Sequence, residues 1–251
     1  MKRNLLLLVV FSICITSFAQ TGDADESEMK QPSKASWAYE AYRGKITRPP
    51  YGLEKILTLL KKSNSDEDDN VVLSPKIYAS LSFREKFTYH MIHGESYGQN
   101  CDAGLATVDE EKKIFAELPG ALGDEHWSDR QEKFFRDNHD SVVALMTASI
   151  DRTHRIGINF KRVIVDINAT EMIPLLISTY NIDKKDHDIL SMLMLLMLNN
   201  KYPPFMTSAS YKKLYADKES SWRTYLNLNA ANEALIIQRA TDFYNGLPKK
   251  V

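Results

Sequence analysis

The stretch that decides the fold is residues 186–199, which read Asp-His-Asp-Ile-Leu-Ser-Met-Leu-Met-Leu-Leu-Met-Leu-Asn. Every residue from 192 to 198 is apolar, so a helix here is apolar all the way round instead of along one stripe. The run is far shorter than the roughly 20 residues that a membrane-spanning helix needs. We therefore expect a helix that neighbouring elements enclose on every side.

Amphipathic helices are predicted before and after this stretch. Residues 53–60 and 160–167 each place apolar side chains at i, i+3, i+4 and i+7, which is one stripe of a helix. Residues 162–167 are also rich in β-branched side chains, so a strand is the alternative there. Further helices are predicted at 37–42, 82–94, 108–118, 128–148, 172–180, 208–215 and 230–245.

Start signals support several of these helices. Ser82 with Glu85 and Ser128 with Gln131 have the spacing of capping boxes. The remaining signals are Ser74 before Pro75, Asn168 with Glu171, and the stop signal Gly246 with Pro248.

The element count predicts the fold class. Seven to nine helices, no convincing set of strands and short connections predict an all-α protein, built as an irregular array of antiparallel helical hairpins. No repeat of fixed length is visible, although the helices are also compatible with a solenoid-like stack. Residues 51–251 are expected to form a single helical domain. Residues 20–50 are expected to form a polar tether that includes a short docking helix near Trp37.

The first residues have the pattern of a secretory signal peptide. Lys2 and Arg3 precede the apolar run 5–15, and Ser17 and Ala19 place small side chains where a signal peptidase reads them. We expect residues 1–19 to be removed and the protein to be exported to the periplasm or the extracellular space. Lipid anchoring at Cys14 is the alternative, but Ile13 stands before it where a small residue is expected.

Net charge and cysteine content limit the classes of function that we expect. The loss of Lys2 and Arg3 would leave 30 basic residues against 33 acidic ones, a formal charge of about −3. This balance predicts neither nucleic-acid binding nor adhesion to anionic lipid. No membrane span is expected in the processed chain, and Cys101 would be its one cysteine, which excludes an intramolecular disulfide.

Residues 90–102 carry the densest chemistry in the chain. His90 and His93 lie three residues apart on one predicted helix, and Glu95, Cys101 and Asp102 follow closely. Imidazole, carboxylate and thiolate are the ligands that zinc prefers, so these five residues are the candidate metal site.

A structural role is the alternative for the first of these histidines. His90 shares its stripe with Phe83, Phe87 and Met91, as a hydrogen-bonded core histidine would. Of the other histidines, His139 is placed on an apolar face, while His126, His154 and His187 have charged neighbours and are expected to face solvent.

The same segment contains a candidate nucleophile. Residues 94–98 match Gly-x-Ser-x-Gly, the turn that exposes the catalytic serine of α/β-hydrolases, which makes Ser96 a candidate. That turn requires a strand before it and a helix after it, whereas a capped helix is predicted to precede it here.

These observations favour an exported, non-catalytic helical domain that binds a protein or a small ligand. No nucleotide-binding loop or strong metal motif occurs, and no cofactor is expected. The alternative is a metal-binding or hydrolytic protein that uses residues 90–102, with a zinc ion as its cofactor.

Overall fold

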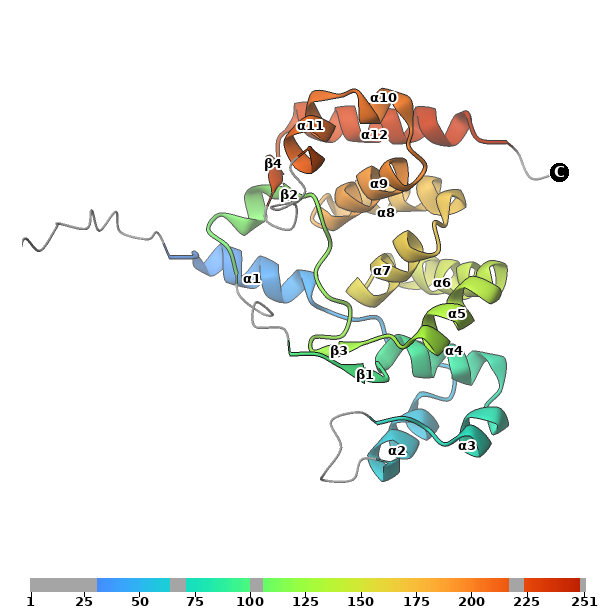
Figure 1. Ribbon diagram of the computed structural model, residues 1–251. Coiled ribbons are helices and arrows are strands. Elements are labelled where there is room, and N and C mark those ends of the chain that lie inside the picture. Colours follow the sequence, from blue (N-terminus) through green and yellow to red (C-terminus); the bar gives the residue numbers. More distant parts are fainter. Residues whose placement is uncertain (1–30, 64–70, 100–105, 217–223, 249–251) are drawn as a thin grey trace, which may run out of the picture. The chain divides into compact units, whose positions relative to one another are not determined.

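Helices account for most of the structure (Figure 1), a computed structural model that describes residues 31–63, 71–99, 106–216 and 224–248. The described residues form twelve α-helices, two 3-10 helices and four short strands. The prediction of a mainly α-helical protein is confirmed. The helix count exceeds seven to nine because several helices, such as α10, are very short. The predicted signal peptide and residues 20–30 of the predicted tether lie outside the described residues.

Six α-helices lie before residue 154. They are α1 (Lys34–Arg43), α2 (Leu53–Ser63), α3 (Pro75–Ser80), α4 (Phe83–Ile92), α5 (Asp129–Asp137) and α6 (His139–Thr153). The helices after residue 154 are α7 (Ile158–Asp166), α8 (Ile173–Asp183), α9 (Asp188–Asn199), α10 (Pro203–Met206), α11 (Ala209–Tyr215) and α12 (Ala230–Asn245). The 3-10 helices are η1 (Glu110–Lys112) and η2 (Thr170–Met172).

The four strands form two antiparallel pairs. Strand β1 (Ser96–Tyr97) pairs with β3 (Glu125–His126), with Ser96 opposite His126. Strand β2 (Lys113–Phe115) pairs with β4 (Tyr225–Asn227), with Ile114 opposite Leu226. The second pair joins segments that are more than a hundred residues apart in the chain.

Helix α9 lies at the centre of the main core, as its sequence predicts. Nine of its residues are buried, including Met192, Leu193 and Met194. It contacts α7, α8, α10, α12 and β2, so neighbours cover it on most sides. Figure 1 shows α8, α9 and α12 side by side, with α7 next to them.

A smaller apolar cluster holds the helices that lie near α4. Ile56, Leu73, Leu81 and Tyr89 are buried together, and α2 contacts α4. Within the described residues, no helix combines the length and the apolar character that crossing a membrane requires.

Capping signals locate several helix starts correctly. Ser82 accepts the Glu85 N–H while the Glu85 carboxylate accepts the Ser82 N–H, which completes a capping box. Ser128 and Gln131 do the same at α5. These reciprocal bonds satisfy N–H groups that have no partner inside the helix.

The single helix predicted at 128–148 is wrong, because the chain breaks it at Asn138. The Asn138 side chain donates a hydrogen bond to the Phe134 carbonyl at 2.8 Å and so ends α5. Asparagine side chains compete with the backbone in this way. His139 is therefore the first residue of α6, and its side chain, which is 28% exposed, lies beside Asp140 and Glu171 and not on a buried apolar face.

The helix predicted at 108–118 is also wrong. Only Glu110–Lys112 are helical, and Lys113–Phe115 form β2 instead. The partner strand β4 supplies the hydrogen bonds that a helix would have made locally, and Ile114 and Phe115 become buried. Non-local pairing of this kind overrides local helix preference.

Two further predictions fail. Asn168 does not cap a helix: it adopts a positive φ of 54°, and its side chain bonds that of Asn200. His187 does not face solvent but is buried against the ring of Tyr39, at 4.9 Å between centroids. By contrast, residues 160–166 are helical within α7 and Ile167 caps its end, so the strand alternative is excluded.

Candidate functional site

The segment with the densest chemistry forms the turn from α4 into β1. His90 lies in the last turn of α4, His93 ends that helix, and Glu95 precedes β1. All three side chains are buried. The structure therefore brings three of the five predicted metal ligands into one region, whereas Cys101 and Asp102 lie outside the described residues.

Gln131, which sequence reasoning used only as a helix cap, holds this turn against α5. Its Oε1 accepts the backbone N–H of Glu95 at 2.9 Å and that of Ser128 at 3.2 Å. Its Nε2 donates to the His93 carbonyl at 2.8 Å and contacts His90 Nδ1 at 3.0 Å. Because the amide orientation follows from these partners, His90 Nδ1 must be an acceptor without a proton.

The remaining ring nitrogen of His90 is also engaged. Nε2 lies 3.0 Å from the Tyr78 hydroxyl, to which it donates in the neutral tautomer that Gln131 imposes. Burial disfavours the charged ring and lowers the pKa of His90 to about 3. His90 is therefore a neutral core histidine with both nitrogens satisfied.

His93 has the opposite electrostatic character. Its Nε2 donates to the Val71 carbonyl, and its Nδ1 lies 3.0 Å from Glu125 Oε2. Burial opposes the charge, but the hydrogen bonds to Glu125 and Val71 prevail and raise the pKa of His93. Since both nitrogens donate, the ring has no lone pair for a metal.

The Glu95 carboxylate is equally occupied. Tyr89 donates to Oε1 at 2.7 Å, Ser128 donates to Oε2 at 2.6 Å, and Arg130 donates to both oxygens. Burial opposes the charge of Glu95, but these bonds outweigh it and hold its pKa below the usual value. The guanidinium of Arg130 also covers the ring of Tyr78 at 4.3 Å.

These contacts support a structural role for the turn. His90, His93 and Glu95 would each have to give up a buried hydrogen bond to bind a metal, and a buried group without a partner costs about 1–3 kcal/mol. In this conformation the three residues are a hydrogen-bonded clamp between α4, β1 and α5, not a vacant ligand set.

Ser96 is in a setting unlike that of a hydrolase nucleophile. Helix α4 precedes the Gly-x-Ser-x-Gly turn and strand β1 contains the serine, which reverses the order that an exposed nucleophile needs. Among the described residues, no side chain makes a hydrogen bond to the Ser96 hydroxyl. Gly94 has a packing reason, because a Cβ there would lie 2.6 Å from the His126 carbonyl oxygen.

A second cluster, which the sequence did not reveal, is a buried charge network. Arg43 contacts Glu110 at 2.7 Å and Asp188 at 2.8 Å, and Lys161 contacts Asp186 at 2.5 Å and Asp188 at 3.1 Å. All five side chains are at least nine-tenths buried. The network joins α1, η1, α7 and the start of α9.

The acids of this network differ in proton affinity. Burial raises the pKa of Asp186, and the neighbouring Asp188 adds to the rise. For Asp188 burial has the same sign, but Arg43 and Lys161 together lower its pKa below the usual value. Charges paired in this way hold segments in register, and they do not by themselves indicate catalysis.

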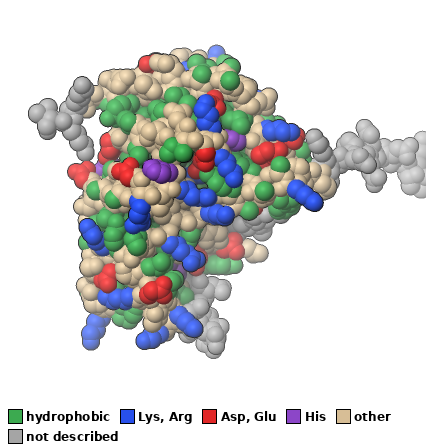
Figure 2. All heavy atoms as spheres, turned by 180° about the vertical axis from the view of Figure 1, so that it is seen from behind, with side chains coloured by type: hydrophobic (Ala, Val, Ile, Leu, Met, Phe, Trp, Pro, Cys, Tyr) green, Lys and Arg blue, Asp and Glu red, His purple; other side chains and the backbone are tan. Residues whose placement is uncertain are grey.

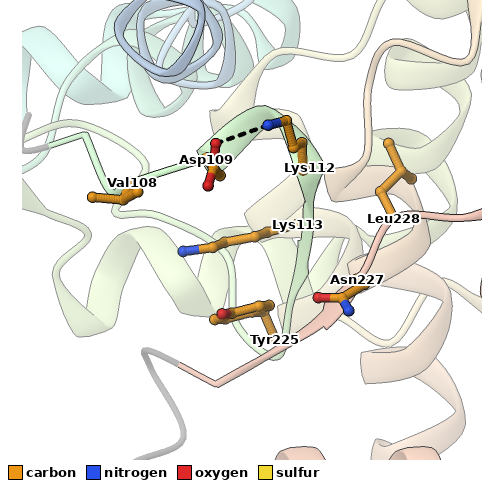
Figure 3. A pocket seen from close by; sticks show the side chains of 7 residues that line it. All are labelled: Val108, Asp109, Lys112, Lys113, Tyr225, Asn227 and Leu228. Atoms are coloured by element: carbon orange, nitrogen blue, oxygen red, sulfur yellow. Dashed lines mark hydrogen bonds and ion pairs between the residues drawn. The ribbon is translucent and has the colours of Figure 1, made fainter. Parts of the chain in front are cut away.

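The third candidate is a pocket of about 430 Å³ beside the β2–β4 pair (Figure 3). Its lining consists of Val108, Asp109, Lys112, Lys113, Tyr225, Asn227 and Leu228. The volume lies within the range of about 300–1,000 Å³ that is usual for small-molecule sites.

Charge in the pocket is unevenly compensated. The Lys112 ammonium pairs with Asp109 at 2.9 Å. The Lys113 ammonium lies 4.2 Å from the centre of the Tyr225 ring, and Figure 3 shows the two side chains extending next to each other. Within the described part of the chain, no carboxylate lies within 4.0 Å of the Lys113 ammonium. The pocket therefore presents a cation next to an aromatic face.

Charged side chains of both signs lie on the face of the molecule that Figure 2 draws. On that face, Lys and Arg side chains alternate with Asp and Glu among apolar and polar groups.

Comparisons of the chain with protein families, curated proteins and solved structures found no match. The proposed function is therefore based on the geometry of the chain's own residues.

Sequence reasoning missed the pocket and the charge network for different reasons. The pocket depends on the β2–β4 pairing, and no local sequence pattern predicts that pairing. The sequence did contain a pattern that predicts the charge network. Asp186 and Asp188 lie at the start of a helix that is apolar all round, and buried acids need cationic partners. Lys161, in a predicted core helix, was the matching cation.

Proposed function

We propose that this protein is an exported, non-catalytic binding protein whose ligand is a small organic anion held in the pocket beside β2 and β4. The observation that carries the proposal is the Lys113 ammonium, 4.2 Å from the centre of the Tyr225 ring in a pocket of about 430 Å³. A carboxylate or phosphate would pair with the ammonium, and a flat or apolar body would contact Tyr225 and Leu228.

Binding without chemistry is favoured by the state of the predicted catalytic groups. The side chains of His90, His93 and Glu95 are already hydrogen-bonded to neighbouring side chains and backbone. Ser96 lacks the strand-turn-helix setting of a hydrolase nucleophile. A ligand in the pocket would meet lysine, tyrosine and asparagine side chains, which suit recognition of an anion.

Nuclear magnetic resonance titration tests the proposal. Phenyl phosphate and benzoate serve as probes, and benzyl alcohol serves as the uncharged counterpart. We expect both anions to shift the backbone amides of β2 and β4, and the alcohol to shift neither. Lys113→Met should weaken binding about tenfold or more, because a hydrogen bond to a charged group contributes about 1.5–3 kcal/mol.

The matched control is Lys133→Met, which removes an exposed lysine on α5 outside the pocket. It should bind the anions as the wild type does. Absence of shifts at β2 and β4 with either anion, or equal binding by the wild type and Lys113→Met, would remove the pocket from consideration.

The same proposal includes export of the protein and an antiparallel, solenoid-like arrangement of its helices. Determination of the N-terminal residue of the protein isolated from the cell envelope or medium tests export, with Gln20 expected first. The antiparallel, solenoid-like stacking of helices is supported by the contacts of α9 with both α8 and α12.

A further inference from the structure

A group of three possible metal ligands lies away from both the pocket and the predicted site. It consists of His139 and Asp140, the first two residues of α6, and Glu171 in η2. One ligand atom from each lies within 4.8 Å of the others. The residues come from two segments that are about thirty positions apart, so the fold and not the local sequence assembles the group.

The geometry around the imidazole resembles coordination more than a simple ion pair. His139 Nδ1 lies 3.1 Å from Asp140 Oδ1 and 3.5 Å from Glu171 Oε1. A single N–H directs its proton well at only one acceptor, whereas two carboxylate oxygens approach the same nitrogen here. Ligand atoms bound tetrahedrally to zinc at about 2.0–2.1 Å lie about 3.3–3.4 Å apart. The two observed distances bracket that separation.

The charges point the same way. The group includes two carboxylates, whose negatively charged oxygens are ligands for a divalent cation. A divalent ion offsets both charges without depending on protonation of the imidazole. The side chains are also open to solvent, with exposed fractions of 28% for His139 and 37% for Glu171, so an ion can enter and keep water in its remaining position.

We infer that His139, Asp140 and Glu171 form a binding site for a divalent zinc-type ion with three protein ligands. The ion would join the start of α6 to η2 and would have at least one coordination position open to water. The neutral imidazole supplies its nitrogen lone pair and each carboxylate supplies one oxygen, which is a ligand set that zinc accepts.

Titration calorimetry with Zn²⁺ at pH 7.5 tests the site, on full-length protein prepared without a polyhistidine tag. We expect one zinc ion per chain and a rise in the melting temperature when zinc is added. His139→Gln and Glu171→Gln should each weaken binding at least tenfold and abolish the rise. Circular dichroism of each variant establishes that the fold is intact.

His126→Gln is the matched control, since His126 is an exposed histidine outside the group. It should retain the affinity of the wild type. Failure of the wild type to bind zinc would overturn the inference. Equal zinc affinity in the wild type and in both ligand variants would also overturn it, because the ion would then be bound elsewhere, for example at Cys101.

Discussion

At the scale of single residues, two histidines three positions apart have opposite protonation states. Gln131 donates to His90 Nδ1 and keeps that ring neutral, whereas His93 donates from both nitrogens to Glu125 and Val71 and carries a charge. Position along the helix does not decide this difference. The hydrogen-bond partners do, and they come from other parts of the chain.

His90 should make the protein sensitive to acid. Its folded pKa of about 3 lies below the unfolded value of about 6.5, so between these values the unfolded state binds the extra proton. The free energy of unfolding therefore falls as the pH drops through that window, by up to about 1.4 kcal/mol per pH unit from this group. His90→Gln removes the titration and should flatten this dependence.

Urea unfolding at pH 7, 6, 5 and 4 measures the effect. At pH 7 His90→Gln should be about 1–3 kcal/mol less stable, because it disturbs buried hydrogen bonds to Tyr78 and Gln131. That deficit should shrink as the pH falls. An unchanged slope in His90→Gln would contradict the assignment of a neutral ring.

At the scale of elements, the start of α7 is locked to the connection between α1 and α2. Asn159 accepts the Thr47 N–H at 2.9 Å and donates to the Thr47 carbonyl at 2.8 Å. Its amide also donates to the Met91 carbonyl of α4 at 2.6 Å. The Gly157 N–H donates to the Thr47 hydroxyl at 2.8 Å. This junction requires close contact between two backbones.

Gly157→Ala should break that contact. A Cβ at Gly157 would lie 2.1 Å from the Thr47 backbone nitrogen, and a backbone atom cannot move aside as a flexible side chain can. We expect a loss of about 1–3 kcal/mol in the free energy of unfolding, as for other overpacked sites. Urea midpoints measure it.

Gly44→Ala is the counterpart for this substitution. Its nearest atom would be 3.7 Å away and its φ is −70°, so alanine fits there. Its stability should be unchanged or slightly raised. If both alanine variants were equally stable, the close approach of the two backbones at Gly157 would not limit the stability of the fold.

At the scale of the whole molecule, the buried charge network links elements that are far apart in the chain. Arg43 ends α1 and reaches Asp188 at the start of the central helix α9, 145 residues later. Its guanidinium also lies 4.4 Å from the ring centre of Phe115 in β2. One side chain therefore ties the first helix, the β2–β4 pair and the core together.

Arg43→Met should cost about 3–5 kcal/mol, since it leaves Asp188 and Glu110 buried without their main cation. Hydrogen exchange should show faster opening of α1 in the variant. Arg152→Met, which removes an exposed arginine on α6, should change the stability by less than about 0.5 kcal/mol. A loss at Arg43 no larger than that at Arg152 would mean that the network contributes little.

Local sequence was sufficient for most of the helices. The apolar periodicity of 53–60 and 160–167, the capping boxes at Ser82 and Ser128, and the all-round apolar run 192–198 each correspond to a helix in the expected place. These signals act within a few residues, because helical hydrogen bonds and caps join positions three or four apart.

Tertiary structure alone decided the strands and the sites. The β2–β4 pair, the pocket next to it, the partners of His90 and His93, and the meeting of His139 with Glu171 all depend on contacts between distant segments. Such contacts exist only in the folded chain, and long-range pairing overrides local preference at residues 113–115. Whether a histidine becomes a cation, a core group or a metal ligand is settled by the partners that the fold delivers, because its pKa responds to burial and neighbouring charge.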